Sequence, residues 1–294
     1  MEKYLEIIKN SYSSYWSYLK KSVLMDLNWE NYFYGLLLIS IVVWGLEMAF
    51  PWRKNQPRFR KGFWLDVFYM FFNFFILNLI VLIALSNSAA EVFNDFLVLV
   101  GMSISSFQLL EINKLPFAAR ILLFFIVVDF TQWWTHRLLH RFEFLWNFHK
   151  VHHSVKQMGF AAHLRYHWME PIIYNSLRYI PLAIIGGFSA QDVAFVHFFA
   201  ITIGHLNHAN INLNYGFLKY ILNNPKMHIW HHAKELPEDR KYGVNFALTL
   251  SIWDYLFKTN YIPYSGKNIE IGFEDDEKFP KSFFKQGIYP LGKK

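Results

Sequence analysis

The stretch WTHRLLHRFEFLWNFHKVHHS, residues 134–154, places five histidines within 21 positions of a chain that contains no cysteine. The first two are spaced i, i+4 and the next three i, i+3, i+4: His136 and His140, then His149, His152 and His153. On a helix these offsets put imidazole rings on one face, one turn apart, where they can converge on a metal ion. Because the chain offers no thiolate, any metal must be held by nitrogen and oxygen.

The clustering continues along the chain, and all thirteen histidines lie between residues 136 and 232. A lone histidine at a helix end is more often a hydrogen-bonded structural residue than a ligand. Ten imidazoles in four helix-spaced clusters, however, would carry a large desolvation cost without a common purpose. Eight to ten nitrogen donors exceed what one ion accepts, which predicts a two-metal centre. The later clusters are the pair His205 and His208, and the triplet His228, His231 and His232.

Two common metal sites are excluded by the letters of the sequence. No HExxH motif occurs, so a zinc protease with a glutamate base on the same helix has no support. A carboxylate-bridged di-iron bundle needs Glu-x-x-His pairs, and the histidine clusters contain no carboxylate. The remaining all-imidazole site favours iron over magnesium or calcium, and ligand type alone leaves zinc, copper and manganese open.

The composition indicates a membrane protein. Apolar residues make up 54% of the 294 residues, aromatic residues 20%, and the mean hydropathy is +0.15. The net charge of +7 comes from basic residues that lie beside long uncharged runs, which fits anionic lipid head groups better than nucleic acid. We therefore expect a lipid environment and no nucleic-acid partner.

Uncharged segments predict where the chain crosses the membrane. Asn31–Leu46 and Val67–Ala90 predict two spans. The five basic residues between positions 53 and 61 place the loop that joins them in the cytoplasm, by the positive-inside rule. A further helix from Phe117 to about His140 would return to the cytoplasmic side. Phe96 to Leu110 is too short for a full span and predicts a re-entrant or interfacial helix.

The last apolar pair, Pro171–Phe188 and Val193 to about Leu213, predicts a helical hairpin. The expected fold is an all-α integral membrane protein with about four transmembrane helices, re-entrant or interfacial helices and a cytoplasmic histidine-rich helical cap. Residues 1–30 are expected to lie on the membrane surface, with a loose soluble leader as the alternative. Residues 31–260 would form a single membrane domain, and residues 261–294 a cytoplasmic tail.

Three histidine boxes make the sequence familiar. HRLLH, HKVHHS and HIWHH, with NHANINL before the last box and WDYLFKT after it, resemble the fatty acid hydroxylase/sterol desaturase superfamily of membrane di-iron oxygenases. The resemblance runs from about Asp129 to Tyr261. It implies two iron ions that use dioxygen to oxidise an unactivated C–H bond of a lipid, on the cytoplasmic side of the plasma membrane in a bacterium or of the endoplasmic reticulum in a eukaryote.

The resemblance also assigns roles to single residues. Ten histidines match or adjoin the family's ligand positions: His136, His140, His149, His152, His153, His205, His208, His228, His231 and His232. His163 and His167 are spaced i, i+4, so spacing alone would make them ligands, but HLRYHWME resembles a family stretch in which His167 and Glu170 support the ligands instead. Asp129 and Asp254 are further candidates for orienting ligand rings, or for bonding to a neighbouring segment. His197 matches no motif and is expected to be structural.

The resemblance implies hydroxylation or desaturation of a lipid such as a fatty acyl chain or a sterol-like molecule. Glyceryl-ether cleavage and carotenoid hydroxylation are alternatives within the same chemistry, and a histidine-lined metal transporter or store is the alternative outside it. The sequence holds no His-Pro-Gly-Gly motif of a fused cytochrome b5. Electrons are therefore expected from a separate ferredoxin, cytochrome b5 or reductase.

Overall fold

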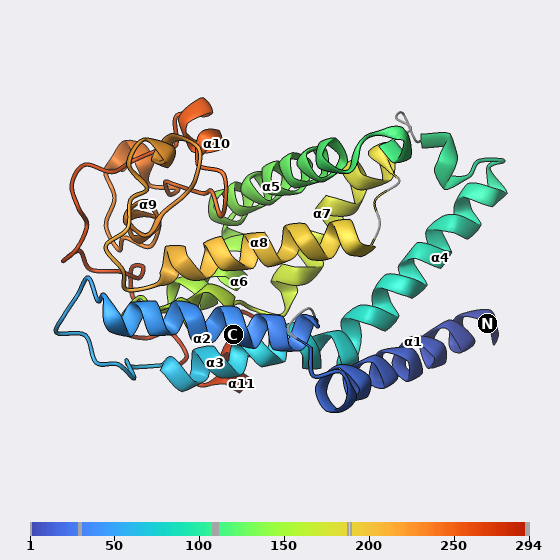
Figure 1. Ribbon diagram of the computed structural model, residues 1–294, viewed down its shortest axis with the longest axis horizontal. Coiled ribbons are helices and arrows are strands. Elements are labelled where there is room, and N and C mark those ends of the chain that lie inside the picture. The colour runs from blue at the N-terminus through green and yellow to red at the C-terminus, as the bar shows by residue number, and fades with distance from the viewer. Residues whose placement is uncertain (1, 29–30, 108–111, 187, 189, 292–294) are drawn as a thin grey trace.

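The protein is built from helices joined by loops. The computed structural model describes residues 2–28, 31–107, 112–186, 188 and 190–291, and within these ranges it contains no β-strand beyond three isolated bridges. Figure 1 shows the main helices running roughly lengthwise. Helices α9 (Pro225–His231) and α10 (Ile252–Leu256) are gathered at one end, and α1 (Glu2–Lys20) lies beside α4 (Ile83–Leu99) at the other. The predicted all-α class is confirmed.

Three helices of the described chain are long and apolar enough to cross a membrane. They are α2 (Tyr32–Ala49), a continuous helix over 63–99, and α5 (Phe117–Arg141). The 63–99 helix comprises α3 (Phe63–Phe71), two π-helical turns η2 (Phe72–Ile76) and η3 (Asn78–Leu82), and α4 (Ile83–Leu99). The sequence predicted about four such helices.

The separate helix predicted from Phe96 to Leu110 is wrong. Phe96–Leu99 is the last turn of α4, because the helix of the preceding span continues through Glu91 and Asp95 to Leu99. Gly101, at φ 71°, then ends the helix in a left-handed turn that favours glycine. Only a short 3-10 turn, η4 (Ile104–Phe107), follows, and residues 108–110 lie outside the described chain.

The predicted hairpin forms as α7 (Met169–Ile185) and α8 (Ala190–His208). Neither helix is among the candidate membrane spans. Helix α8 ends at His208 rather than near Leu213, since residues beyond it leave the helix to pair Ile211 with Pro51 in an isolated bridge. Between α5 and α7 lies α6 (Glu143–His153), which carries the second histidine box.

The two ends of the chain pack against the helices. Helix α1 (Glu2–Lys20) runs antiparallel to the 63–99 helix, with Lys3 bonded to Asp95 and the Tyr12 hydroxyl donating to the carbonyl of Ile80. At the other end, the segment predicted as a tail packs against α3. The buried Gln286 side chain accepts a hydrogen bond of 2.9 Å from the Tyr69 hydroxyl. The placement of α1 on a membrane surface stays a prediction.

Candidate metal centre

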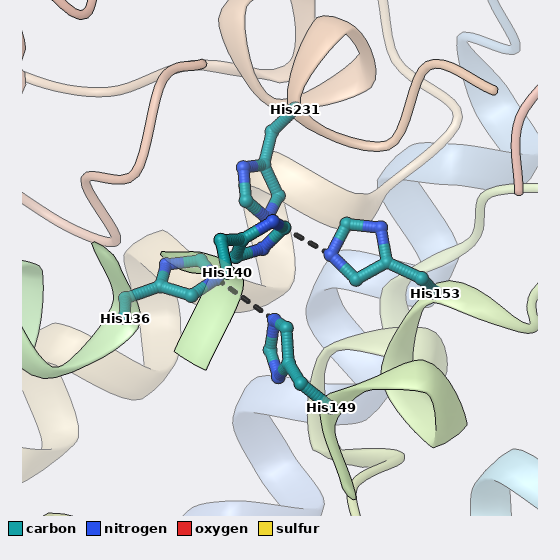
Figure 2. Close-up of side chains that lie close together, drawn as sticks. All are labelled: His136, His140, His149, His153 and His231. Carbon is teal, nitrogen blue, oxygen red and sulfur yellow. Dashed lines mark hydrogen bonds between the residues drawn. The ribbon is translucent and has the colours of Figure 1, made fainter. Parts of the chain in front are cut away.

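Five histidines form the first group of converging rings, shown in Figure 2. They come from α5, α6 and α9 (Pro225–His231), and one ring nitrogen from each lies within 4.8 Å of the others. Helix geometry explains the α5 and α6 contributions, because residues spaced i, i+4 share a face. The members of this first group are His136, His140, His149, His153 and His231.

A second group of four buried histidines lies beside the first. It draws one ring from α6, one from the end of α8, one from α9 and one from the residue that caps α9, again within 4.8 Å of one another. The two groups touch, because the ring centroids of His153 and His232 stack 4.4 Å apart. The members of this second group are His152, His208, His228 and His232.

Acceptors on the surrounding backbone orient several of these rings through Nδ1. The carbonyls of Phe246 and Val244 lie 2.7 Å and 2.8 Å from Nδ1 of His136 and His231, respectively. In the second group, the Arg165 carbonyl lies 3.1 Å from Nδ1 of His152 and the Gly204 carbonyl 2.8 Å from Nδ1 of His208. A carbonyl can only accept, so Nδ1 carries the proton in each ring and Nε2 presents a lone pair.

The lone pairs meet in a way that fits a bound cation. Nε2 of His152 and Nε2 of His208 are 3.3 Å apart, although both rings hold their proton on Nδ1. Two facing lone pairs repel unless a cation or an added proton lies between them. Burial opposes the added proton and lowers the pKa of His152 to about 3. The residues present therefore fit a metal ion, whose ligands must be neutral imidazoles.

The first group shows the same arrangement. Nε2 of His136 faces Nε2 of His149 at 3.0 Å, and the remaining nitrogen of His149 lies 2.8 Å from the carboxylate of Glu170. Burial lowers the pKa of His149 to about 3 and raises that of Glu170 to about 7. A cation bound to the His149 ring would oppose the effect on Glu170, because a nearby positive charge favours the ionised carboxylate. Nε2 of His140 is buried without a protein partner among the described residues. Nitrogen donors of this kind suit iron, zinc or copper.

Of the four predicted supporting residues, Glu170 directly contacts a ring of the first group, that of His149. Asp129 instead accepts hydrogen bonds from the Trp253 indole and the Leu250 amide, which is the structural alternative considered for it. Asp254 acts at one remove from the rings. It accepts bonds from the amides of Phe246 and Ala247 and so holds the loop that orients His136.

The other histidines lie outside both groups. His205, predicted as the tenth ligand, has its nitrogens 3.1 Å from the Ser40 hydroxyl and 3.0 Å from Nδ1 of His163. His163 itself is held in a space that exists because residue 204 is glycine, where a Cβ would lie 2.2 Å from the ring. His167 lies 3.0 Å from the carbonyl of Gly287 and so contacts the C-terminal segment. His197 lies 3.3 Å from the Tyr32 hydroxyl.

Sequence reasoning missed an ion-pair network that supports the second group. The buried carboxylate of Asp66 pairs with Arg60 at 2.5 Å and with Arg165 at 2.9 Å. Arg165 supplies the carbonyl that orients His152, so the network ties the start of α3 to a ring of the second group. Asp66 itself, a charge at the start of an apolar run, was the feature of the sequence that could have revealed this network. Arg60 is one of the five basic residues used above to place the loop in the cytoplasm, and it is buried in an ion pair.

A cavity of about 440 Å³ opens onto both groups. Its wall includes His136 and His149 from the first group and His152, His208 and His228 from the second. The remaining wall is mostly apolar and aromatic, and it is supplied by α1, α2, the π-helical turns η2 and η3, α5, α7 and α8. This volume is in the range of sites for small organic ligands.

Comparison with known proteins agrees with this site. Residues 121–259 match the fatty acid hydroxylase family. The chain is 33% identical to the ornithine lipid hydroxylase OlsE of Rhizobium tropici over 184 residues, which is 62% of this chain and 53% of that protein. It is 34% identical to human alkylglycerol monooxygenase over 46% of the chain and 29% of that protein, and 24% identical to methylsterol monooxygenase 1-2 of Arabidopsis thaliana over 58% and 60%. No solved structure matches.

The region that matches the fatty acid hydroxylase family contains every histidine of the two groups. The predicted resemblance is confirmed. The chain spans about half the length of the ornithine lipid hydroxylase and less than a third of human alkylglycerol monooxygenase.

Proposed function

We propose that this protein is a membrane oxygenase that uses dioxygen and externally supplied electrons to hydroxylate a lipid. One observation carries the proposal: two adjacent groups of imidazoles, with lone pairs facing one another, form one wall of a mostly apolar cavity. The match of residues 121–259 to the fatty acid hydroxylase family supports it, as do relatives named for hydroxylation of an ornithine lipid and oxidation of a methylsterol.

Two iron ions would be held by the nine grouped histidines, one ion for each group. Iron bound there supplies the redox chemistry that activates dioxygen. The protein's own residues contribute orientation and exclusion of water. The carbonyls of Phe246, Val244, Arg165 and Gly204 fix the protonated side of four rings, and burial keeps the imidazoles neutral and the oxidant away from bulk water.

The cavity would place one carbon of a lipid chain beside the two groups. Cleavage of a glyceryl ether is the second candidate, supported by the 34% identity to human alkylglycerol monooxygenase. Both reactions begin with oxidation of a C–H bond, so the products distinguish them: a hydroxylated lipid in one case and a released aldehyde in the other. A metal transporter predicts ligands spaced along a path across the membrane, whereas here nine histidines form two touching groups.

The site is proposed to face the cytoplasm. The basic loop between α2 and α3 lies at the same end of the molecule as the cap, since Arg53 donates its amide to the side chain of Asn210, two residues beyond the last histidine of α8. Loops rich in Lys and Arg stay on the cytoplasmic side. A separate ferredoxin, cytochrome b5 or reductase would deliver electrons there.

Metal analysis of the purified full-length chain tests the proposal. We expect iron in the wild-type protein, and we expect His231→Ala in the first group and His152→Ala in the second each to lower the metal content. His205→Ala is the matched control, because this ring lies outside both groups. Lipid extracts of cells with and without the gene, compared by mass spectrometry, should differ by one oxygen atom. Unchanged metal content in both ligand variants would refute the dinuclear site.

A further inference from the structure

The cavity wall changes character away from the histidine groups. Polar side chains gather there on α7 and α8, whereas the rest of the wall is mostly apolar and aromatic. Arg178 is the only lysine or arginine among the described residues that line the cavity. The neighbouring polar members of this wall are Tyr32, Tyr174, Asn175 and His197.

Helix α7 connects the histidine groups to Arg178 along one wall of the cavity. Glu170, Tyr174 and Arg178 are spaced i, i+4, i+8, so they share one face of the helix, and all three line the cavity. Glu170 is bonded to His149 at the metal end. Eight residues at the rise of an α-helix put Arg178 roughly 12 Å further along the cavity.

Helix α8 leads to the same region. His197 lies eleven residues before His208, or roughly 16 Å along the helix from the second histidine group. Burial lowers the pKa of His197 to about 4, with a smaller contribution from the charge of Arg178. One of its nitrogens donates a 3.0 Å hydrogen bond to the Asn175 side chain.

An arginine in the wall of a mostly apolar cavity favours ligands with an anionic group. Arg178 is half-buried in this wall, where apolar neighbours make the charge of a guanidinium costly unless hydrogen-bond acceptors or an anion lie beside it. The planar guanidinium fork matches the oxygen pairs of a carboxylate or a phosphate. An aliphatic chain that leaves such a head group would run along the apolar wall toward the two histidine groups.

We propose that the cavity binds a lipid by a single anionic head group at Arg178, with the hydrocarbon chain extending toward the metal-binding histidines. The oxidation of that chain rests on the proposed function, whereas binding of the head group does not. Arg178 then sets which carbon reaches the histidine groups, because it fixes one end of the substrate. A fatty acid carboxylate and a phospholipid phosphate are the two sources of this chemistry.

Binding of three sixteen-carbon probes to the purified full-length protein, held without oxygen to prevent turnover, tests the proposal. The probes are palmitate, hexadecyl phosphate and the uncharged hexadecanol. We expect at least one anion to bind about tenfold or more tightly than hexadecanol, as a charge-assisted bidentate contact provides. Preference for palmitate identifies a carboxylate ligand, and preference for hexadecyl phosphate a phosphate ligand.

Variants assign the preference to one side chain. Arg178→Gln should bind the anions no more tightly than hexadecanol, and Arg178→Lys should keep part of the preference. Asn175→Asp places a competing carboxylate beside the guanidinium. It should weaken the binding of the two anions and leave the binding of hexadecanol unchanged. Arg58→Gln, the same substitution at an exposed arginine of the basic loop, should bind as the wild type does.

The proposal is overturned if wild type shows no preference for an anion, or if Arg178→Gln retains it. Should Arg178→Gln fail to fold, Asn175→Asp decides the question, and an unchanged preference in that variant overturns the proposal. The outcome is separate from that of the proposed function. A protein that binds anions through Arg178 but yields no oxidised lipid refutes the oxygenase and leaves the head-group site standing.

Discussion

Replacing Asp254 by asparagine tests how the loop that orients His136 is held in place. The buried carboxylate accepts four hydrogen bonds, from the Trp133 indole, the Phe246 and Ala247 amides and the Thr259 hydroxyl, at 2.6 to 2.9 Å. Burial raises the pKa of Asp254 above its ordinary value, and these donors favour its ionised form.

The magnitude follows from the direction of these bonds. Oδ1 receives three donors and Oδ2 receives the Ala247 amide, so an asparagine with its oxygen in the first position points an NH₂ group at that amide. One buried N–H then has no acceptor, at a cost of about 1–3 kcal/mol, and the three other bonds lose the charge that strengthens them. We expect Asp254→Asn to lower the free energy of unfolding by about 2–4 kcal/mol.

The assay combines stability with metal binding. Thermal unfolding in detergent should show the loss of stability, and titration with ferrous iron should show weaker binding, by about 10- to 100-fold, because Phe246 no longer holds the His136 ring. Asp239→Asn is the matched control, since this carboxylate in the same cap is exposed. Wild-type stability together with wild-type iron affinity in Asp254→Asn would refute the reasoning.

Three further predictions test packing, protonation and the ion-pair network. Gly204→Ala should lower the free energy of unfolding by about 1–3 kcal/mol, because its Cβ would overlap the His163 ring. Gly45→Ala is the control, and its thermal unfolding midpoint should not change because a Cβ there meets nothing within 4 Å. An unfolded histidine has a pKa of about 6.5, whereas burial lowers the pKa of His152 to about 3. As the pH falls below about 6.5, the unfolded state therefore binds a proton before the folded state does. Stability of the metal-free protein should therefore be full above that pH and fall toward pH 3; equal midpoints at pH 8 and pH 5 would contradict this. Asp66→Asn leaves two buried arginines without their carboxylate and should cost about 3–5 kcal/mol, measured by the same unfolding assay.

The helical spans could be predicted because they depend on local composition. An apolar run of sufficient length forms a helix in a membrane whatever its neighbours are, since the backbone has no other hydrogen-bonding partner there. The residues at which these helices begin and end were harder to predict. The sequence from residue 63 to 99 contains Asp66, Glu91 and Asp95, and the charges suggested boundaries where the helix in fact continues. Asp66 is tolerated because two arginines from distant segments neutralise it.

The spacing of the histidine boxes also identified the rings that converge, with His205 as the exception. Nine of the ten predicted ligands lie in the two groups. His205 shares a helix with His208, but its ring is turned toward Ser40 and His163 instead. Spacing along a helix gives the relative direction of two side chains, and it gives no information about which neighbour each one meets.

The sequence by itself determined that this is a helical membrane protein with an all-imidazole site. Only the tertiary structure decided how the rings divide between the two groups. His152 and His153 are adjacent in the sequence yet belong to different groups, as do His231 and His232. Successive residues of a helix point about 100° apart, so neighbours face different partners, and those partners are set by how α5, α6, α8 and α9 pack.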